Sequence, residues 1–164
     1  MNKTIRHYEE SSVIPATAEQ IFAYIDDHTR FSSHMNKSSL MMGGGKMKTK
    51  VDEGKGQIVG SHILLSGTAF GIKIFLDEVV TSHEPPFIKT WETVGTPKLL
   101  IIGSYGMGID IKPQNTHSLL RVFIDYDLPT KNKWLGRIFS GVYAKWCVRQ
   151  MINGTRDEFI LQSH

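Results

Sequence analysis

Apolar and polar residues alternate along most of the first 128 residues, which predicts a series of β-strands. The clearest row is Phe70, Ile72, Ile74 and Leu76, with Lys73 and Asp77 on the opposite face. Similar segments lie between turns rich in glycine and proline. They predict further strands at 5–14, 46–53, 57–66, 87–94, 99–111 and 117–128. No strand alternates with a full-length helix, so the pattern favours an antiparallel meander over a parallel sheet.

Helical signals occur at two places. Pro15 ends the first strand, and Thr17 followed by Gln20 is typical of a capping box that begins a short helix ending near 26–27. A second short helix or turn is expected over 29–34. Near the C-terminus, helical spacing of apolar residues predicts one long helix from Asn132 to about Leu161. Its predicted apolar positions are Leu135, Ile138, Phe139, Val142, Trp146 and Met151.

Three glycines interrupt this long helix: Gly136, Gly141 and Gly154. Each costs about 1 kcal/mol relative to alanine inside a helix. Close approach of the helix to the sheet, or a kink, explains their presence, and a frayed helix start is the alternative.

A broad sheet followed by a single long helix predicts an α+β fold. The apolar face of the sheet must be buried, and the helix is the element that can cover it. When a sheet curls around one helix, a cavity between the two is the natural consequence. The pattern therefore favours a protein that binds a small molecule or a lipid, with chemistry in the same cavity as the alternative.

Composition indicates one ordinary globular domain over 1–164, with 40% hydrophobic and 21% charged residues. The single cysteine, Cys147, excludes an internal disulfide and is expected to be a buried, inert thiol. The first residues contain no apolar run typical of a signal peptide, and no apolar segment reaches the roughly 18–20 residues that cross a bilayer. We therefore expect a cytoplasmic protein without integral membrane association.

The net charge of +3 is mild. Lysines gather between Lys46 and Lys55, but Asp52 and Glu53 lie among them and no aromatic residue is interleaved. Nucleic-acid binding uses both basic residues and exposed aromatic rings. A solvated strand face is therefore the better interpretation, and no nucleic-acid partner is expected.

Three stretches resemble the SRPBCC superfamily, the START-like or birch-pollen-allergen-like proteins. They are VIPATAEQIFAYIDD at 13–27, EPPFIKTWE at 84–92 and the segment 128–146. The resemblance extends over nearly the whole chain, and its polyketide cyclase/dehydrase and lipid-transport group is the most similar. It implies a helix-grip fold, in which a curved seven-stranded antiparallel sheet wraps around a long C-terminal helix, with two short helices after the first strand. It also implies a ligand cavity between sheet and helix, without a cofactor.

The expected cavity lining combines apolar and aromatic side chains, from strands where alternation places them inward and from the long helix. The candidate ligand-binding residues are Phe70, Ile72, Ile74, Trp91, Tyr105, Met107, Val122, Tyr126, Tyr143 and Trp146. Packing in the core is the alternative role for each. Tyr105 and Tyr126 are the stronger candidates because a buried hydroxyl needs a partner. Met41 and Met42, beside three glycines, are expected at the cavity entrance, with a dimer contact or a membrane-touching edge as alternatives.

No catalytic residue is assigned. His62 is a possible base only if it points inward, and Glu92 is either a buried acid or a partner of Lys89. The seven histidines lack the spacing of a metal site, so no metal is expected.

Binding of a hydrophobic molecule is the leading hypothesis, and a cyclase/dehydratase-type enzyme is the alternative. A third hypothesis is an interaction module that uses Phe75 and Phe123 on the outer sheet face.

Overall fold

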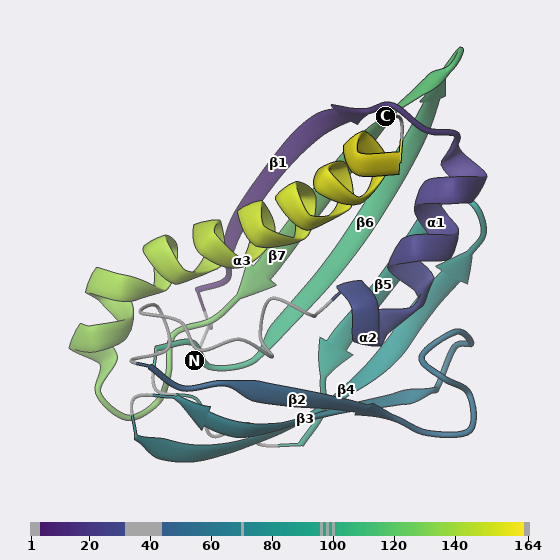
Figure 1. Cartoon of the computed structure of the whole chain (residues 1–164). Coiled ribbons are helices and arrows are strands. Elements are labelled where there is room, and N and C mark those ends of the chain that lie inside the picture. The colour runs from purple at the N-terminus through teal and green to yellow at the C-terminus, as the bar shows by residue number, and fades with distance from the viewer. Residues whose placement is uncertain are drawn as a thin grey trace.

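The computed structural model describes residues 4–31, 44–69, 71–95, 97, 99 and 101–162. Within them, seven strands form one antiparallel sheet in the order β1-β7-β6-β5-β4-β3-β2 (Figure 1). The strands are β1 (Arg6–Ile14), β2 (Met47–Val51), β3 (His62–Ala69), β4 (Ile72–Glu84), β5 (Ile88–Thr93), β6 (Tyr105–Gln114) and β7 (His117–Tyr126). The helices are α1 (Ala18–Asp26), α2 (His28–Phe31) and α3 (Lys133–Gln162). The predicted α+β fold class is confirmed.

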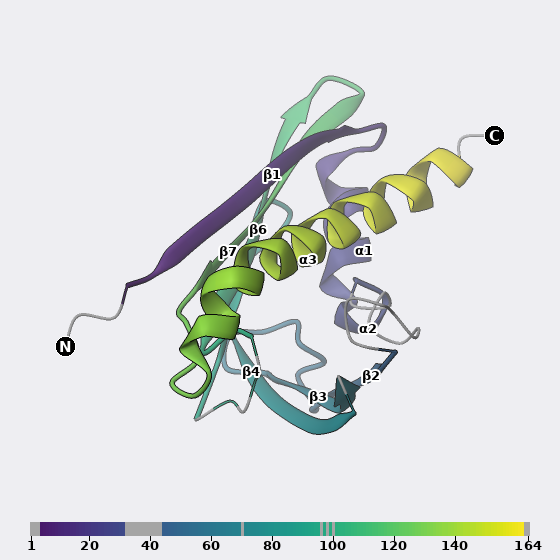
Figure 2. The ribbon, with the colours of Figure 1, turned by 90° about the vertical axis from the view of Figure 1, so that its left-hand side faces the viewer.

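The sheet is strongly curved, and α3 runs along its concave side (Figures 1 and 2). Strands β2 to β7 follow one another as a meander, and β1 returns to pair with β7, with Ile14 opposite Ser118. The short helices α1 and α2 stand on the same side of the sheet as α3 (Figure 1). The main core therefore lies between the concave face and the three helices, and it includes Ile21, Ile109 and Val148.

The predicted start of α1 is confirmed. The Thr17 side chain accepts a hydrogen bond from the Gln20 amide at 3.2 Å, and the Gln20 side chain accepts one from the Thr17 amide at 3.0 Å. The helix buries Ile21, Phe22 and Ile25. Helix α2 covers only His28–Phe31, and the rest of the predicted second helix lies outside the described residues.

Two strands begin later than the alternation predicts, because carboxylates hold the preceding turns. β3 begins at His62 instead of residue 57, since Asp52 accepts hydrogen bonds from the Gly54 amide at 3.0 Å and the His62 amide at 2.8 Å. β6 begins at Tyr105 instead of residue 99, since Asp127 accepts bonds from the Ser104 amide at 2.7 Å and hydroxyl at 2.9 Å.

Helix α3 has the expected length, but the predicted apolar face is wrong in its first half. Ile138, Phe139 and Val142 are exposed. The buried positions are Gly136, Ser140, Ala144, Cys147, Val148, Met151, Ile152, Thr155 and Phe159. Small side chains let the helix approach closely, and a Cβ added at Gly136 would lie 2.5 Å from Cδ of Pro129. Close approach, rather than side-chain size, decides which face is buried.

Among the residues that the structure describes, no helix is both long enough and apolar enough to cross a membrane.

Candidate functional site

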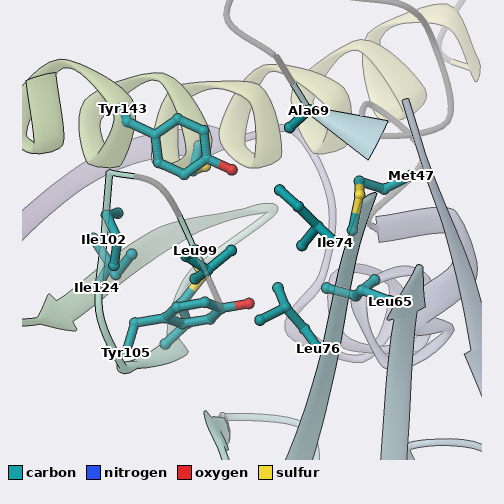
Figure 3. A pocket seen from close by; sticks show the side chains of 12 residues that line it. Met47, Leu65, Ala69, Ile74, Leu76, Leu99, Ile102, Tyr105, Ile124 and Tyr143 are labelled. Carbon is teal, nitrogen blue, oxygen red and sulfur yellow. The ribbon is translucent and has the colours of Figure 1, made fainter. Parts of the chain in front are cut away.

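An apolar pocket lies between the concave sheet face and α3 (Figure 3). Strands β2, β3, β4, β6 and β7 contribute, together with the segment before β6 and with α3. The lining residues are Met47, Leu65, Ala69, Ile74, Leu76, Leu99, Ile102, Tyr105, Met107, Ile124, Tyr143 and Cys147. The free volume is about 40 Å³, well below the roughly 300–1,000 Å³ of drug-sized ligand pockets. In this conformation the lining side chains themselves fill most of the space.

Two tyrosine hydroxyls point into the pocket from opposite walls. Tyr143 descends from α3 and Tyr105 rises from β6, and both hydroxyl oxygens are directed toward the side lined by Ile74 and Leu76 (Figure 3). Burial raises the pKa of both phenols well above the ordinary value. Both therefore stay neutral and can donate hydrogen bonds at physiological pH.

A buried carboxyl, Glu78, lies beside this pocket. Alternation along β4 places Ile74, Leu76 and Glu78 on the same inward face, and Glu78 is 2% exposed. Its Oε2 has no hydrogen-bond partner among the described residues. Burial raises its pKa to about 8, while the Tyr105 hydroxyl and the Lys89 charge act in the opposite direction. The carboxyl is therefore mostly protonated at pH 7, in contrast to an exposed glutamate.

Neither of the acid–base candidates proposed with Tyr105 faces the pocket. Glu92 is exposed, and its neighbour Lys89 turns inward instead of pairing with it. His62 is also exposed, and its Nδ1 lies 2.8 Å from Oδ1 of Asp77 on the outer face of the sheet. The inward acid is Glu78, which the sequence analysis missed although it continues the period-two row through Ile74.

The predicted ligand-binding residues divide into four groups. Ile74, Tyr105, Met107 and Tyr143 line the pocket. Trp91, Val122 and Tyr126 are buried in the adjoining core, and partly buried Trp146 packs against the Met47 cluster. Ile72 was wrongly placed inward: as the first residue of β4 it is 51% exposed. Phe70, Met41 and Met42 lie outside the described residues.

Eight pocket-lining residues were absent from the prediction: Met47, Leu65, Ala69, Leu76, Leu99, Ile102, Ile124 and Cys147. Leu76 and Ile124 share the parity of residues that were chosen, so the sequence contained their signal. Leu99 and Ile102 precede β6 in irregular backbone. No periodicity marks such positions.

A second buried polar cluster joins the end of α1 to β4 and β5. Lys89 is completely buried, and its Nζ lies 3.1 Å from Oδ1 of Asp26. His83 Nε2 lies 2.9 Å from the same oxygen. Burial lowers the pKa of Lys89, and the charge of Asp26 opposes this shift. The cluster thus fixes α1 against the sheet, because the buried ammonium of Lys89 requires the carboxylate of Asp26 beside it.

A shallow polar hollow of about 470 Å³ lies between β1 and α3. Arg149 Nε lies 2.9 Å from Oε1 of Glu10, so these two charges are paired, and Arg156 donates a hydrogen bond to the neutral side chain of Asn153. Within the described ranges, no three His, Cys, Asp or Glu side chains come close enough to hold a metal ion.

No protein-family model matches the chain, and no curated protein matches it. Many solved structures do. An aromatase/cyclase from Streptomyces sp. R1128 is similar with a TM-score of 0.74 at 12% identity, over 98% of this chain and 97% of that one. A norcoclaurine synthase point mutant from Thalictrum flavum, in complex with a transition-state analogue, has a TM-score of 0.69 at 12% identity over 100% and 99% of the chains.

Ara h 8.0201 is a third similar structure, with a TM-score of 0.64 at 11% identity over 96% of this chain and 99% of that one. At such identities the likeness concerns the fold. It confirms what the resemblance to the SRPBCC superfamily implies: the chain has the helix-grip fold.

Proposed function

We propose that this protein binds a small, mainly apolar molecule that carries one oxygen-containing polar group. The observation that carries the proposal is the composition of the pocket. Its wall is apolar, and two neutral phenols, Tyr105 and Tyr143, point into it. The neutral carboxyl of Glu78 lies at its edge with an oxygen that has no hydrogen-bond partner in the described part of the chain.

The polar groups select for oxygen in the ligand. A buried polar atom without a partner costs about 1–3 kcal/mol, and a ligand that supplies the partner recovers that free energy. The protonated carboxyl of Glu78 and the hydroxyl of Tyr105 can each donate to a carbonyl or hydroxyl oxygen. An alkane of the same length fills the apolar space but offers neither group a hydrogen-bond partner, so Oε2 of Glu78 stays unsatisfied.

The pocket must enlarge to admit such a molecule. Its walls come from separate elements, and Leu99 and Ile102 lie outside helices and strands. Met47 and Met107 are unbranched side chains that can change rotamer to fill or vacate space. Ligand binding is therefore coupled to movement of the lining.

The similar solved structures support a small-molecule role. They include an aromatase/cyclase and a synthase that holds a transition-state analogue. A fold hosts many functions, so these names raise the expectation without assigning the activity.

An enzyme of the cyclase/dehydratase type is the second candidate, and Glu78 is the observation that favours it. In that role the protonated carboxyl of Glu78 and the hydroxyl of Tyr105 both donate hydrogen bonds to a substrate carbonyl oxygen and stabilise the negative charge that develops on it. Binding without turnover, observed for the same compound, separates the carrier from the catalyst.

The test compares two ligands of matched length, 2-decanone and decane, by native mass spectrometry and by isothermal titration calorimetry. We expect the ketone to bind, and we expect E78L and Y105F, each of which removes one donor, to weaken its binding by about tenfold, which corresponds to one hydrogen bond of about 1.4 kcal/mol. The matched control is E92L, which changes an exposed carboxyl on a neighbouring strand. Equal affinities for ketone and decane, or for all variants, would contradict the proposal.

Identifying any compound that co-purifies with the protein is an independent test of the proposed ligand class. Native mass spectrometry followed by denaturing extraction identifies its mass. An oxygen-containing apolar compound supports the proposal, and a polyanionic one counts against it.

A further inference from the structure

The first turns of α3 present their largest apolar side chains to solvent. Trp134 is 62% exposed, Ile138 60%, Val142 56% and Phe139 46%. Trp134, Ile138 and Val142 are four residues apart, so they form one line along the helix, with Phe139 beside it. We call these four residues the outer face of α3. In Figure 2 no labelled helix or strand lies in front of these turns.

The core does not require this outer face. The same turns attach to the fold through Gly136, Ser140 and Ala144, which are buried on the opposite side of the helix. Single exposed apolar residues are ordinary on protein surfaces, but four adjacent ones with two aromatic rings mark an interaction site.

The charged residues of α3 around this face, and of the segment just before it, are basic. Residues 128–156 contain six basic residues and no aspartate or glutamate. They are Lys131, Lys133, Arg137, Lys145, Arg149 and Arg156. The neighbouring strand β1 adds Arg6, which bonds to Ser140, and Glu10, which pairs with Arg149. The rim of the outer face therefore remains cationic.

We propose that the outer face of α3 docks onto a lipid bilayer surface that carries anionic headgroups. The apolar side chains enter the interfacial layer, and Lys131, Lys133 and Lys145 approach the headgroups. Tryptophan is well suited to this boundary because its ring is apolar and its indole N–H is polar. The helix lies on the surface and does not cross it.

The charge pattern favours lipid over a second copy of this chain. A symmetric dimer through this face would bring the same cationic rim of each copy against the other, and like charges repel. An anionic surface neutralises them instead. The docking does not depend on the proposed pocket ligand, so the ligand-free protein is used to test it.

Vesicle flotation provides the test, with phosphatidylcholine vesicles compared with phosphatidylcholine vesicles containing phosphatidylserine. We expect the protein to float with the anionic vesicles only, and to dissociate as salt is raised. Tryptophan emission should shift to shorter wavelength on binding, and W134F should lose most of that shift, because Trp91 is buried and Trp146 is partly buried against the Met47 cluster. Absence of flotation with anionic vesicles would overturn the proposal.

Variants locate the contact. I138S/V142S should weaken binding by about tenfold or more, because it removes apolar side chains from the interface. K131Q/K133Q/K145Q should weaken it by about a hundredfold, roughly fivefold per cation. F75S is the matched control, since Phe75 is 59% exposed on β4. Unchanged binding of I138S/V142S, or a stable dimer that this variant dissociates, would overturn the proposal.

Discussion

Glu78 on β4 and Tyr105 on β6 interact inside the protein, although strand β5 lies between their strands. Glu78 is opposite Thr93 of β5, and the Thr93 hydroxyl oxygen accepts a hydrogen bond from the Tyr105 amide at 3.1 Å. The two side chains also influence each other's ionisation: the Tyr105 hydroxyl lowers the pKa of Glu78, and Glu78 raises that of Tyr105. Burial outweighs the first of these effects, so the carboxyl stays neutral.

The buried carboxyl makes stability depend on pH in a defined window. Its folded-state pKa is about 8, against an ordinary value of 4.5. Below 4.5 both states are protonated and the stabilising effect is fully present. Between these values the unfolded chain releases the proton while the folded chain keeps it. The free energy of unfolding therefore falls as pH rises, by about 1.4 kcal/mol per unit of pKa difference, and levels off above the folded pKa.

E78Q removes this titration. We expect the difference in unfolding free energy between E78Q and the parent chain, measured by urea denaturation, to move in favour of E78Q as the pH rises from 4.5 to 8. E92Q serves as the control, because Glu92 is exposed. Parallel pH profiles for E78Q and the parent chain would show that Glu78 ionises normally.

Two glycines of α3 should respond oppositely to alanine. At Gly136 an added Cβ would lie 2.5 Å from Pro129 Cδ and 3.0 Å from the Ile101 carbonyl oxygen. Overpacking of this kind costs about 1–3 kcal/mol, more than the gain in helix propensity. At Gly154 the nearest atom is the Tyr24 hydroxyl at 3.9 Å, so G154A should stabilise the helix by about 1 kcal/mol. Thermal unfolding of the two variants measures both effects, and equal shifts would refute the assigned close contact.

Cys147 should react slowly with thiol reagents in the native protein. Burial raises its pKa to about 12 from an ordinary 9.0, which lowers the thiolate fraction at neutral pH by about a thousandfold. Labelling with Ellman's reagent, compared between native and denaturant-unfolded chains, gives the ratio directly, because the sequence contains one cysteine. Since Cys147 lines the pocket, a bound ligand should slow the native reaction further. Equal native and unfolded rates would place the thiol outside the pocket.

The Lys89–Asp26 pair should be more sensitive to loss of one partner than of both. D26N leaves the buried ammonium without its carboxylate and should cost about 3 kcal/mol or more of stability. K89M replaces the ammonium by an apolar side chain of similar length, so D26N/K89M should cost less than the sum of the single changes. A urea-denaturation double-mutant cycle tests this.

The surface pair Arg30–Glu158 is the control, and E158Q should change stability by less than about 1 kcal/mol. Strict additivity at Lys89 and Asp26 would show that the two groups act separately.

The fold was predictable because its signals are local. Alternation identified the strands, and the capping residues Thr17 and Gln20 identified the start of α1. Strand starts were less predictable, because Asp52 and Asp127 bind backbone amides in three dimensions and hold turns where the apolar pattern continues.

The pocket was predictable only in part. Tyr105 follows from alternation, and Tyr143 was chosen as an aromatic residue of the long helix; both line the pocket. Glu78 did not stand out, because a charged residue next to Asp77 is usually solvated. The outward turn of Ile138 and Val142 also escaped prediction, since periodicity locates an apolar stripe without showing that small residues pack more closely against the sheet.

The small free volume of the pocket has a kinetic consequence. A space of about 40 Å³ admits only a few atoms until the lining moves. If this opening precedes binding, the observed association rate rises with ligand concentration only until it equals the opening rate, and then stays constant. Release passes through the same opening, so residence time is governed by protein motion. Ligands that differ several-fold in affinity would then share one limiting rate of capture.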